Sequence, residues 1–250
     1  MKKIVLFIFT VAFAIALLAC DNPEAIKNEG TAYGITDGAC PIKVTMTVDG
    51  DGKILEAQIY EYLSVYDMGA LEGDGQAYYS YGVQIDNAVD GYAKIVRVGD
   101  KIFEYTGGTY FCNQLDGEDK SFDGYVSTAI GGEWYISCVN EGDFDIVRED
   151  GSDYGVPFDE YDGCGLKKSE WADKLKNGWH DGKNYDSSYK ENIYKISTHL
   201  RNHGFYGYDG TDNLSSEGTH KVGKYDTLVD MPNFHDYMKI AQKAYNAASK

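Results

Sequence analysis

Proline and basic residues are scarce in this chain. Its 250 residues include 4 prolines, and 23 lysines and arginines face 40 aspartates and glutamates. The resulting formal net charge of −17 repels phosphate backbones and acidic lipid headgroups. We therefore expect no nucleic-acid partner, and attachment to a membrane must come from something other than surface charge.

The motifs of common catalytic and cofactor sites are also missing. The sequence contains no CxxC pair, no GxSxG, no Walker loop and no GxGxxG that opens a helix. These absences exclude the usual signatures of zinc ribbons, thioredoxin-like sites, hydrolase nucleophiles and nucleotide-phosphate loops. Because no complete catalytic set is visible, we expect a binding protein rather than an enzyme.

Aromatic residues and glycine, by contrast, are abundant. The chain has 22 tyrosines, 10 phenylalanines, 3 tryptophans and 29 glycines. This much aromatic surface supplies a hydrophobic core in spite of the acidity. The many Asp-Gly pairs are typical of tight turns. The composition predicts a folded, β-rich exported domain.

The N-terminus indicates export and lipid anchoring. Lys2 and Lys3 precede an apolar run from Ile4 to Ala19, which is shorter than the roughly 20 residues that span a bilayer as a helix. A basic head, a short apolar core and a small residue before the cut describe a signal peptide over residues 1–19. The final Leu-Leu-Ala-Cys resembles the lipobox of bacterial lipoproteins, which implies a lipid on Cys20. We expect a lipid-anchored protein on the exported side of the cell membrane or the outer membrane, and the choice between them stays open.

Four further cysteines follow Cys20: Cys40, Cys112, Cys138 and Cys164. Outside the cytoplasm, an even set of this kind predicts two disulfides in any of three pairings. Free buried thiols are the alternative.

The remaining chain divides by composition. Residues 20–31 are polar and predict a lipidated tether. Residues 32–250 predict one α+β domain, antiparallel and β-rich up to about residue 162, with C-terminal helices packed on the sheet.

The clearest local signal is a hairpin over residues 41–62. Apolar and polar residues alternate on both sides of an Asp-Gly-Asp-Gly turn at 49–52. Alternation also predicts strands at 93–98, 101–106 and 133–139.

Helical spacing replaces this alternation after residue 162. We predict helices from Ser169 to Gly178, over 188–204 and over 233–248. The second opens with a Ser-x-x-Glu capping box and is expected to bury one apolar face, formed by Ile193, Ile196 and Leu200.

One histidine pair fits metal-ligand spacing. His199 and His203 are four residues apart, so a helix would place both on one face, as zinc would require. A third ligand would have to come from His180, His220, His235 or a carboxylate. The alternative is a polar edge on the predicted helix.

The hairpin also carries a family resemblance. Tyr33-Gly34, Pro41-Ile42-Lys43-Val44 and the run from Val48 to Ile54 resemble the start of flavin mononucleotide-binding domains. Such domains occur in the G subunit of Rnf complexes, the C subunit of sodium-pumping quinone reductases and related anchored lipoproteins, some of them surface immunogens. The resemblance implies FMN as a possible cofactor.

In that family, a D-x-x-S-G-A-T segment carries a threonine joined to the flavin phosphate, and a helix follows directly. The matching positions here read Asp230-Met231-Pro232-Asn233, which lack the threonine. A second stretch, residues 123–129, has its serine and threonine in another order, and we expect no helix after it. The resemblance therefore implies a degenerate site without covalent flavin. We predict instead that Asp230 and Asn233 cap the last helix.

Three functions follow from these features. The first is a surface or periplasmic interaction protein or antigen without catalysis of its own, whose protein partner the sequence does not name. The second is a non-covalent FMN protein of envelope electron transfer. The third is a zinc-binding protein that uses His199 and His203.

Overall fold

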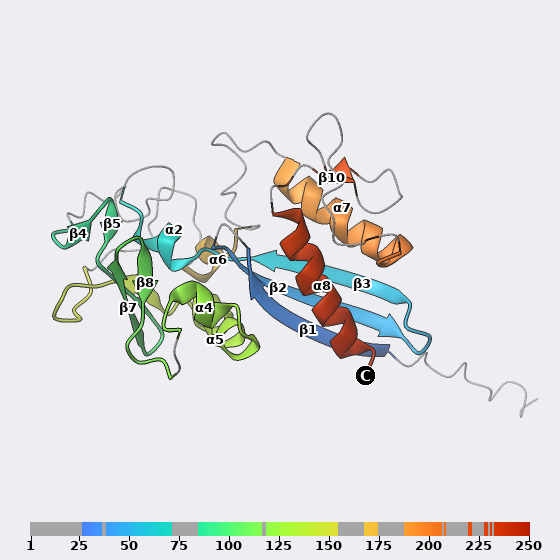
Figure 1. Ribbon diagram of the computed structural model, residues 1–250, viewed down its shortest axis with the longest axis horizontal. Helices are drawn as coiled ribbons and strands as arrows, with labels where there is room; N and C mark the ends of the chain where they lie inside the picture. Colours follow the sequence, from blue (N-terminus) through green and yellow to red (C-terminus); the bar gives the residue numbers. More distant parts are fainter. Residues whose placement is uncertain are drawn as a thin grey trace, which may run out of the picture.

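Figure 1 shows the computed structural model of the chain. The structure describes residues 27–36, 39–71, 85–116, 119–154, 168–174, 188–206, 208, 220–221, 228–229, 231 and 233–250.

Three long strands form an antiparallel sheet in the order β1-β2-β3. They are β1 (Lys27–Ile35), β2 (Pro41–Asp49) and β3 (Ile54–Glu61). The predicted hairpin is confirmed: Asp49 Oδ1 accepts hydrogen bonds from the backbone N–H groups of Asp51 and Lys53, and Gly52 has a φ of 80°. Because β1 begins at Lys27, part of the stretch expected to be tether is strand.

Two helices cover one face of this sheet. The helix α8 (Phe234–Ala248) packs on β1 and β2, and α7 (Ser188–His203) packs on β3 (Figure 1). Alternation along β2 buries four apolar side chains against them, those of Ile42, Val44, Met46 and Val48. The predicted apolar face of α7 is confirmed, since Ile193, Ile196 and Leu200 are all buried.

A second antiparallel sheet has the order β8-β7-β6-β9. Its strands are β6 (Ile95–Val98), β7 (Lys101–Thr106), β8 (Thr109–Phe111) and β9 (Phe144–Ile146). This sheet packs with the short helices α2 (Val65–Gly69) and α4 (Phe122–Val126) and the longer α5 (Ala129–Glu141) around a second core, rich in aromatic rings. Phe122 lies in edge-to-face contact with Tyr66, Phe103 and Tyr135.

The strand predicted at 133–139 is wrong, because these residues belong to α5. Thr128 Oγ1 accepts a hydrogen bond from the N–H of Gly131 and starts the helix, and Gly142 ends it with a left-handed φ of 74°. The buried residues recur at helical intervals, at Gly132, Tyr135, Ile136 and Val139. The β-forming side chains of this stretch misled the prediction, since propensity yields to tertiary packing.

The described residues also form two short ladders and one more short helix. Two ladders pair β4 (Ala88–Val89) with β5 (Tyr92–Ala93) and β10 (His220–Lys221) with β11 (Leu228–Val229). The helix predicted from Ser169 to Gly178 corresponds to α6 (Lys168–Ala172), which ends earlier because Asp173 pairs with Tyr62 in a β-bridge, and residues 175–178 lie outside the described part. The α+β class is confirmed, with antiparallel sheets and the C-terminal helices α7 and α8 on the first sheet. Helices α2, α4 and α5, however, lie in the part expected to be mostly strands.

Candidate functional site

The third strand forms an edge of the first sheet. At its C-terminal end, the N–H of Lys174 donates to the carbonyl of Glu61, and just after the strand the N–H of Leu63 donates to the carbonyl of Ala172. Both hydrogen bonds are 3.0 Å long. These bonds occupy the sheet edge at this end. They also show that Glu61 and Leu63 direct their backbone groups away from β2.

Backbone direction alternates along a strand, so every second residue of β3 faces outward. Tyr62 donates inward to the carbonyl of Pro41, whereas Glu61 accepts from outside the sheet. By alternation, Ile59 and Ala57 also direct their N–H and C=O groups outward. Within the described residues, no strand pairs with this side of β3 between Ile54 and Tyr60.

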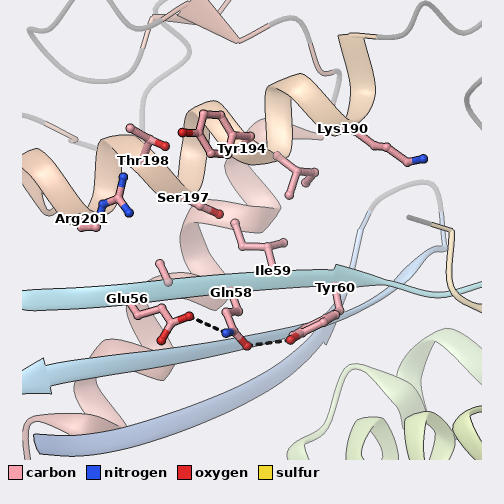
Figure 2. A pocket seen from close by; sticks show the side chains of 11 residues that line it. Glu56, Gln58, Ile59, Tyr60, Lys190, Tyr194, Ser197, Thr198 and Arg201 are labelled. Atoms are coloured by element: carbon pink, nitrogen blue, oxygen red, sulfur yellow. Dashed lines mark hydrogen bonds between the residues drawn. The ribbon is translucent and has the colours of Figure 1, made fainter. Parts of the chain in front are cut away.

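A groove of about 390 Å³ lies between this edge and α7. Figure 2 shows the two walls: side chains from β3 on one side and from successive turns of α7 on the other. The lining combines apolar, hydroxyl and charged groups, from Glu56, Ala57, Gln58, Ile59, Tyr60, Lys190, Ile193, Tyr194, Ser197, Thr198 and Arg201. The volume is within the range of pockets that hold ligands.

Side chains on the outer face of β3 are held in a fixed row. Tyr60 Oη donates to Gln58 Oε1, and Gln58 Nε2 donates to Glu56 Oε1, each over 2.6 Å (Figure 2). Because these bonds link every second residue, they hold one face of the strand without using its outward backbone groups. The backbone edge and the side-chain row are therefore separate features of the same wall.

Charge on the rim of the groove differs from that of the whole protein. The chain carries −17, yet Lys190 and Arg201 line the groove from α7. Figure 2 shows Lys190 near the Tyr60 end and Arg201 near the Glu56 end. Glu56 lines the groove as well, so its charged groups are of both signs, in contrast to the strongly negative chain as a whole.

A second cavity of about 650 Å³ continues beyond Arg201, which lines both. It lies between the β2–β3 turn, the end of α7 and α8, with Lys53, His203 and Tyr206 among its lining residues. Tyr206 is 63% exposed there.

The two histidines predicted as zinc ligands occupy different environments. Their rings are 5.1 Å apart, but His199 is buried and His203 is exposed. Burial, and then the neighbouring His203, lowers the pKa of His199 to about 4. In the part of the chain that the structure describes, no third histidine, cysteine or carboxylate completes a metal-binding group with them. Of the other candidates, His180 lies outside the described residues.

No disulfide joins Cys40, Cys112 and Cys138 to one another in the described part. Cys164, the fourth cysteine of the predicted framework, lies outside it. Cys112 is buried, and Cys40 and Cys138 are partly buried. The two disulfides stay a prediction.

The positions matched to the flavin segment show a different helix start from the predicted one. Asn233 occupies the position before α8, but its side chain makes no capping hydrogen bond, and Asp230 lies outside the described residues. At the other stretch, the expectation that no helix follows residues 123–129 is wrong, since α5 begins there.

The hydroxyl at that second helix start is already engaged. Thr128 Oγ1 donates to the Tyr125 carbonyl over 2.7 Å and accepts from Gly131 N–H over 3.0 Å. A small cavity beside it, lined by Ser127 and Lys239 among others, measures about 100 Å³. This is below the ~300–1,000 Å³ typical of cofactor pockets. Non-covalent FMN binding therefore rests on the resemblance.

Cys20 and the signal peptide lie outside the described residues. Among the helices that are described, none has the length and apolarity to cross a membrane.

Sequence reasoning missed the groove. The prediction of α7 found its buried stripe, and the only binding residues it named on this helix were His199 and His203. A signal was present in Tyr194, Ser197, Thr198 and Arg201, which recur at helical intervals and are mostly uncharged. The packing of α7 against the edge of β3, by contrast, is a tertiary contact that no local sequence pattern predicts.

Comparisons with known proteins return no relative. No protein-family model, no curated protein and no solved structure matches the chain.

Proposed function

We propose that the chain is an exported, lipid-anchored interaction protein that binds an extended polypeptide segment by adding it to the edge of β3. The observation that carries this proposal is the outward-facing backbone of Ala57 and Ile59 at the floor of the groove beside α7. Strand addition to an open sheet edge is a recurrent mode of peptide recognition. Its backbone hydrogen bonds supply affinity, and the pockets for alternate side chains supply specificity.

The two walls of the groove fit the two faces of such a strand. Side chains of the added segment that point toward α7 would lie beside Ile193 and Ser197, and those that point away would lie beside the Gln58 row. Arg201 and Glu56 place one charge of each sign in the groove, and they favour a segment whose side chains carry the complementary charges. The lipid on Cys20 would hold this binding site at the membrane, where its partner is another envelope polypeptide.

A peptide-display experiment tests the proposal. The mature chain with Cys20→Ser is used to select binders from a library of random extended peptides. Each selected peptide is then resynthesised with N-methyl groups on one or the other set of alternate residues. Strand addition predicts that one set abolishes binding and the other leaves it nearly unchanged, because only alternate N–H groups face the edge.

Two variants of α7 locate the site. Ser197→Trp fills the groove and is expected to reduce affinity by more than roughly tenfold, as loss of backbone contacts would. Lys195→Trp places the same side chain outside the groove lining and serves as the matched control. Equal effects of both N-methyl sets, or unchanged binding to Ser197→Trp, would exclude strand addition here. An absorbance scan of the same purified protein checks the flavin alternative.

A further inference from the structure

The buried side chain of Lys174 contacts Cys40, one of the four cysteines of the predicted disulfides. Lys174 follows α6 and is 3% exposed. Its Nζ lies 3.0 Å from Cys40 Sγ, closer than to either neighbouring carboxylate. Those carboxylates are Asp67 Oδ2 at 3.3 Å and Glu61 Oε1 at 3.4 Å.

Each member of this cluster is held by the fold. The backbone N–H of Lys174 donates to the Glu61 carbonyl, which places its side chain beside the end of β3. Tyr237 of α8 donates to the Glu61 carboxylate. Asp67 accepts from the backbone N–H and the hydroxyl of Ser64 at the start of α2. Four separate segments therefore hold the amine and the two carboxylates, and the backbone N–H of Cys40 donates to Thr36 Oγ1 on a fifth.

We propose that Cys40 and Lys174 form a covalent sulfur–nitrogen cross-link when a peroxide oxidises the thiol. In the first step the thiol and one hydrogen peroxide give a sulfenic acid and one water. In the second step Lys174 Nζ attacks Sγ, the S–O bond breaks, and hydroxide leaves and takes up a proton as water. The sum is one thiol, one amine and one peroxide converted into an S–N bond and two waters, a two-electron oxidation of sulfur.

The geometry suits the second step. A separation of 3.0 Å is a near-attack distance for two atoms that are to be joined. The amine must lose a proton before it attacks, and the carboxylates of Asp67 and Glu61 are within reach to accept it. Sulfenic acids condense with backbone nitrogen to give sulfenamides, and the lysine amine would take the place of that nitrogen here.

Both steps are expected to be slow. Burial, and then the Glu61 carboxylate, raises the pKa of the Cys40 thiol to about 12, so little thiolate is present at neutral pH for the first step. Burial alone would lower the pKa of Lys174, but Asp67 and Glu61 outweigh it and raise that pKa well above its usual value, so the neutral amine that the second step needs is also scarce. The cross-link would therefore accumulate during sustained exposure in an oxidising compartment rather than respond to a brief pulse.

Mass spectrometry of the mature chain with Cys20→Ser tests the proposal. Incubation with hydrogen peroxide should lower the mass by about 2 Da for this pair, and a reductant should restore it. A tryptic digest should then lose cleavage after Lys174 and join its peptide to the peptide that contains Cys40. A Cys138→Ser variant should form the same joined peptide.

A variant of the amine separates the two steps. Lys174→Arg keeps the positive charge, but its guanidinium stays protonated and does not attack sulfur. Dimedone, which traps sulfenic acid, should label Cys40 more strongly in this variant than in the parent. If the Lys174→Arg variant fails to fold, the tryptic digest of the parent still shows whether the Cys40 and Lys174 peptides are joined.

Four results would overturn the proposal. They are an unmodified Cys40 after prolonged exposure, a sulfinic acid there, dimedone labelling of the parent equal to that of Lys174→Arg, and a joined peptide that retains an added oxygen.

Discussion

Protonation of His199 should make the protein less stable in acid. The side chain is 2% exposed on the apolar side of α7, and its pKa falls from an ordinary 6.5 to about 4. Between these two values the unfolded chain binds a proton at His199 that the folded chain does not. The free energy of unfolding therefore falls as the pH falls through this window, and it is independent of this group above about pH 7.

The magnitude follows from the shift. Each pKa unit corresponds to 1.36 kcal/mol, so the shift from 6.5 to about 4 predicts a loss of about 3 kcal/mol by pH 4. Urea unfolding followed by tryptophan fluorescence measures it at several pH values across the window. Carboxylates titrate there too, so the comparison is between the parent and His199→Gln, which lacks only this ionisation.

The matched control is His203→Gln, one helical turn away on an exposed position. We expect its free energy of unfolding to change with pH as that of the parent does. In His199→Gln, the free energy of unfolding should fall much less between about pH 6.5 and pH 4. If His199→Gln and the parent lose stability in parallel over this range, the buried neutral histidine is refuted.

Three further predictions concern the packing and the anchor. Lys174→Met should lower the free energy of unfolding by about 3–5 kcal/mol, because it leaves the buried Glu61 and the partly buried Asp67 without their cation, while Lys94→Met on the surface leaves the urea midpoint unchanged. Gly30→Ala should cost at least about 1–3 kcal/mol in the same assay, since its Cβ would overlap the α8 backbone, while Gly50→Ala meets nothing within 4 Å. Cys20→Ser should abolish incorporation of labelled fatty acid and release the protein from membranes, and retained label would contradict the lipobox interpretation.

Local patterns predicted much of the first sheet and its helices. The alternation from Ile42 to Val48 and the Asp-Gly turn at 49–52 specify a hairpin without any long-range information, because both are properties of neighbouring residues. The apolar stripe of α7 was predictable for the same reason. The helical residues 133–139 were not, since their side chains favour a strand and only packing against the second core makes them helical.

The candidate site was out of reach of the sequence for a different reason. Arg201 and Ala57 are far apart in the chain and meet only because α7 packs along β3. Likewise, nothing near Cys40 indicated that its neighbour would be Lys174 rather than another cysteine, because the two are 134 residues apart. Sequence patterns indicate which face of a single helix or strand is buried. The groove and the Cys40–Lys174 contact, however, both form between elements that are distant in the chain.

Amide hydrogen exchange along β3 tests the central claim most directly. In the ligand-free mature protein, Ala57 and Ile59 should exchange fast because their N–H groups face the open edge, while Gln58 and Tyr60, which bond inward to β2, should exchange slowly. A bound peptide should then protect Ala57 and Ile59 and leave the other two unchanged. Equal protection of all four amides in the ligand-free protein would show that the edge is already covered and would contradict strand addition.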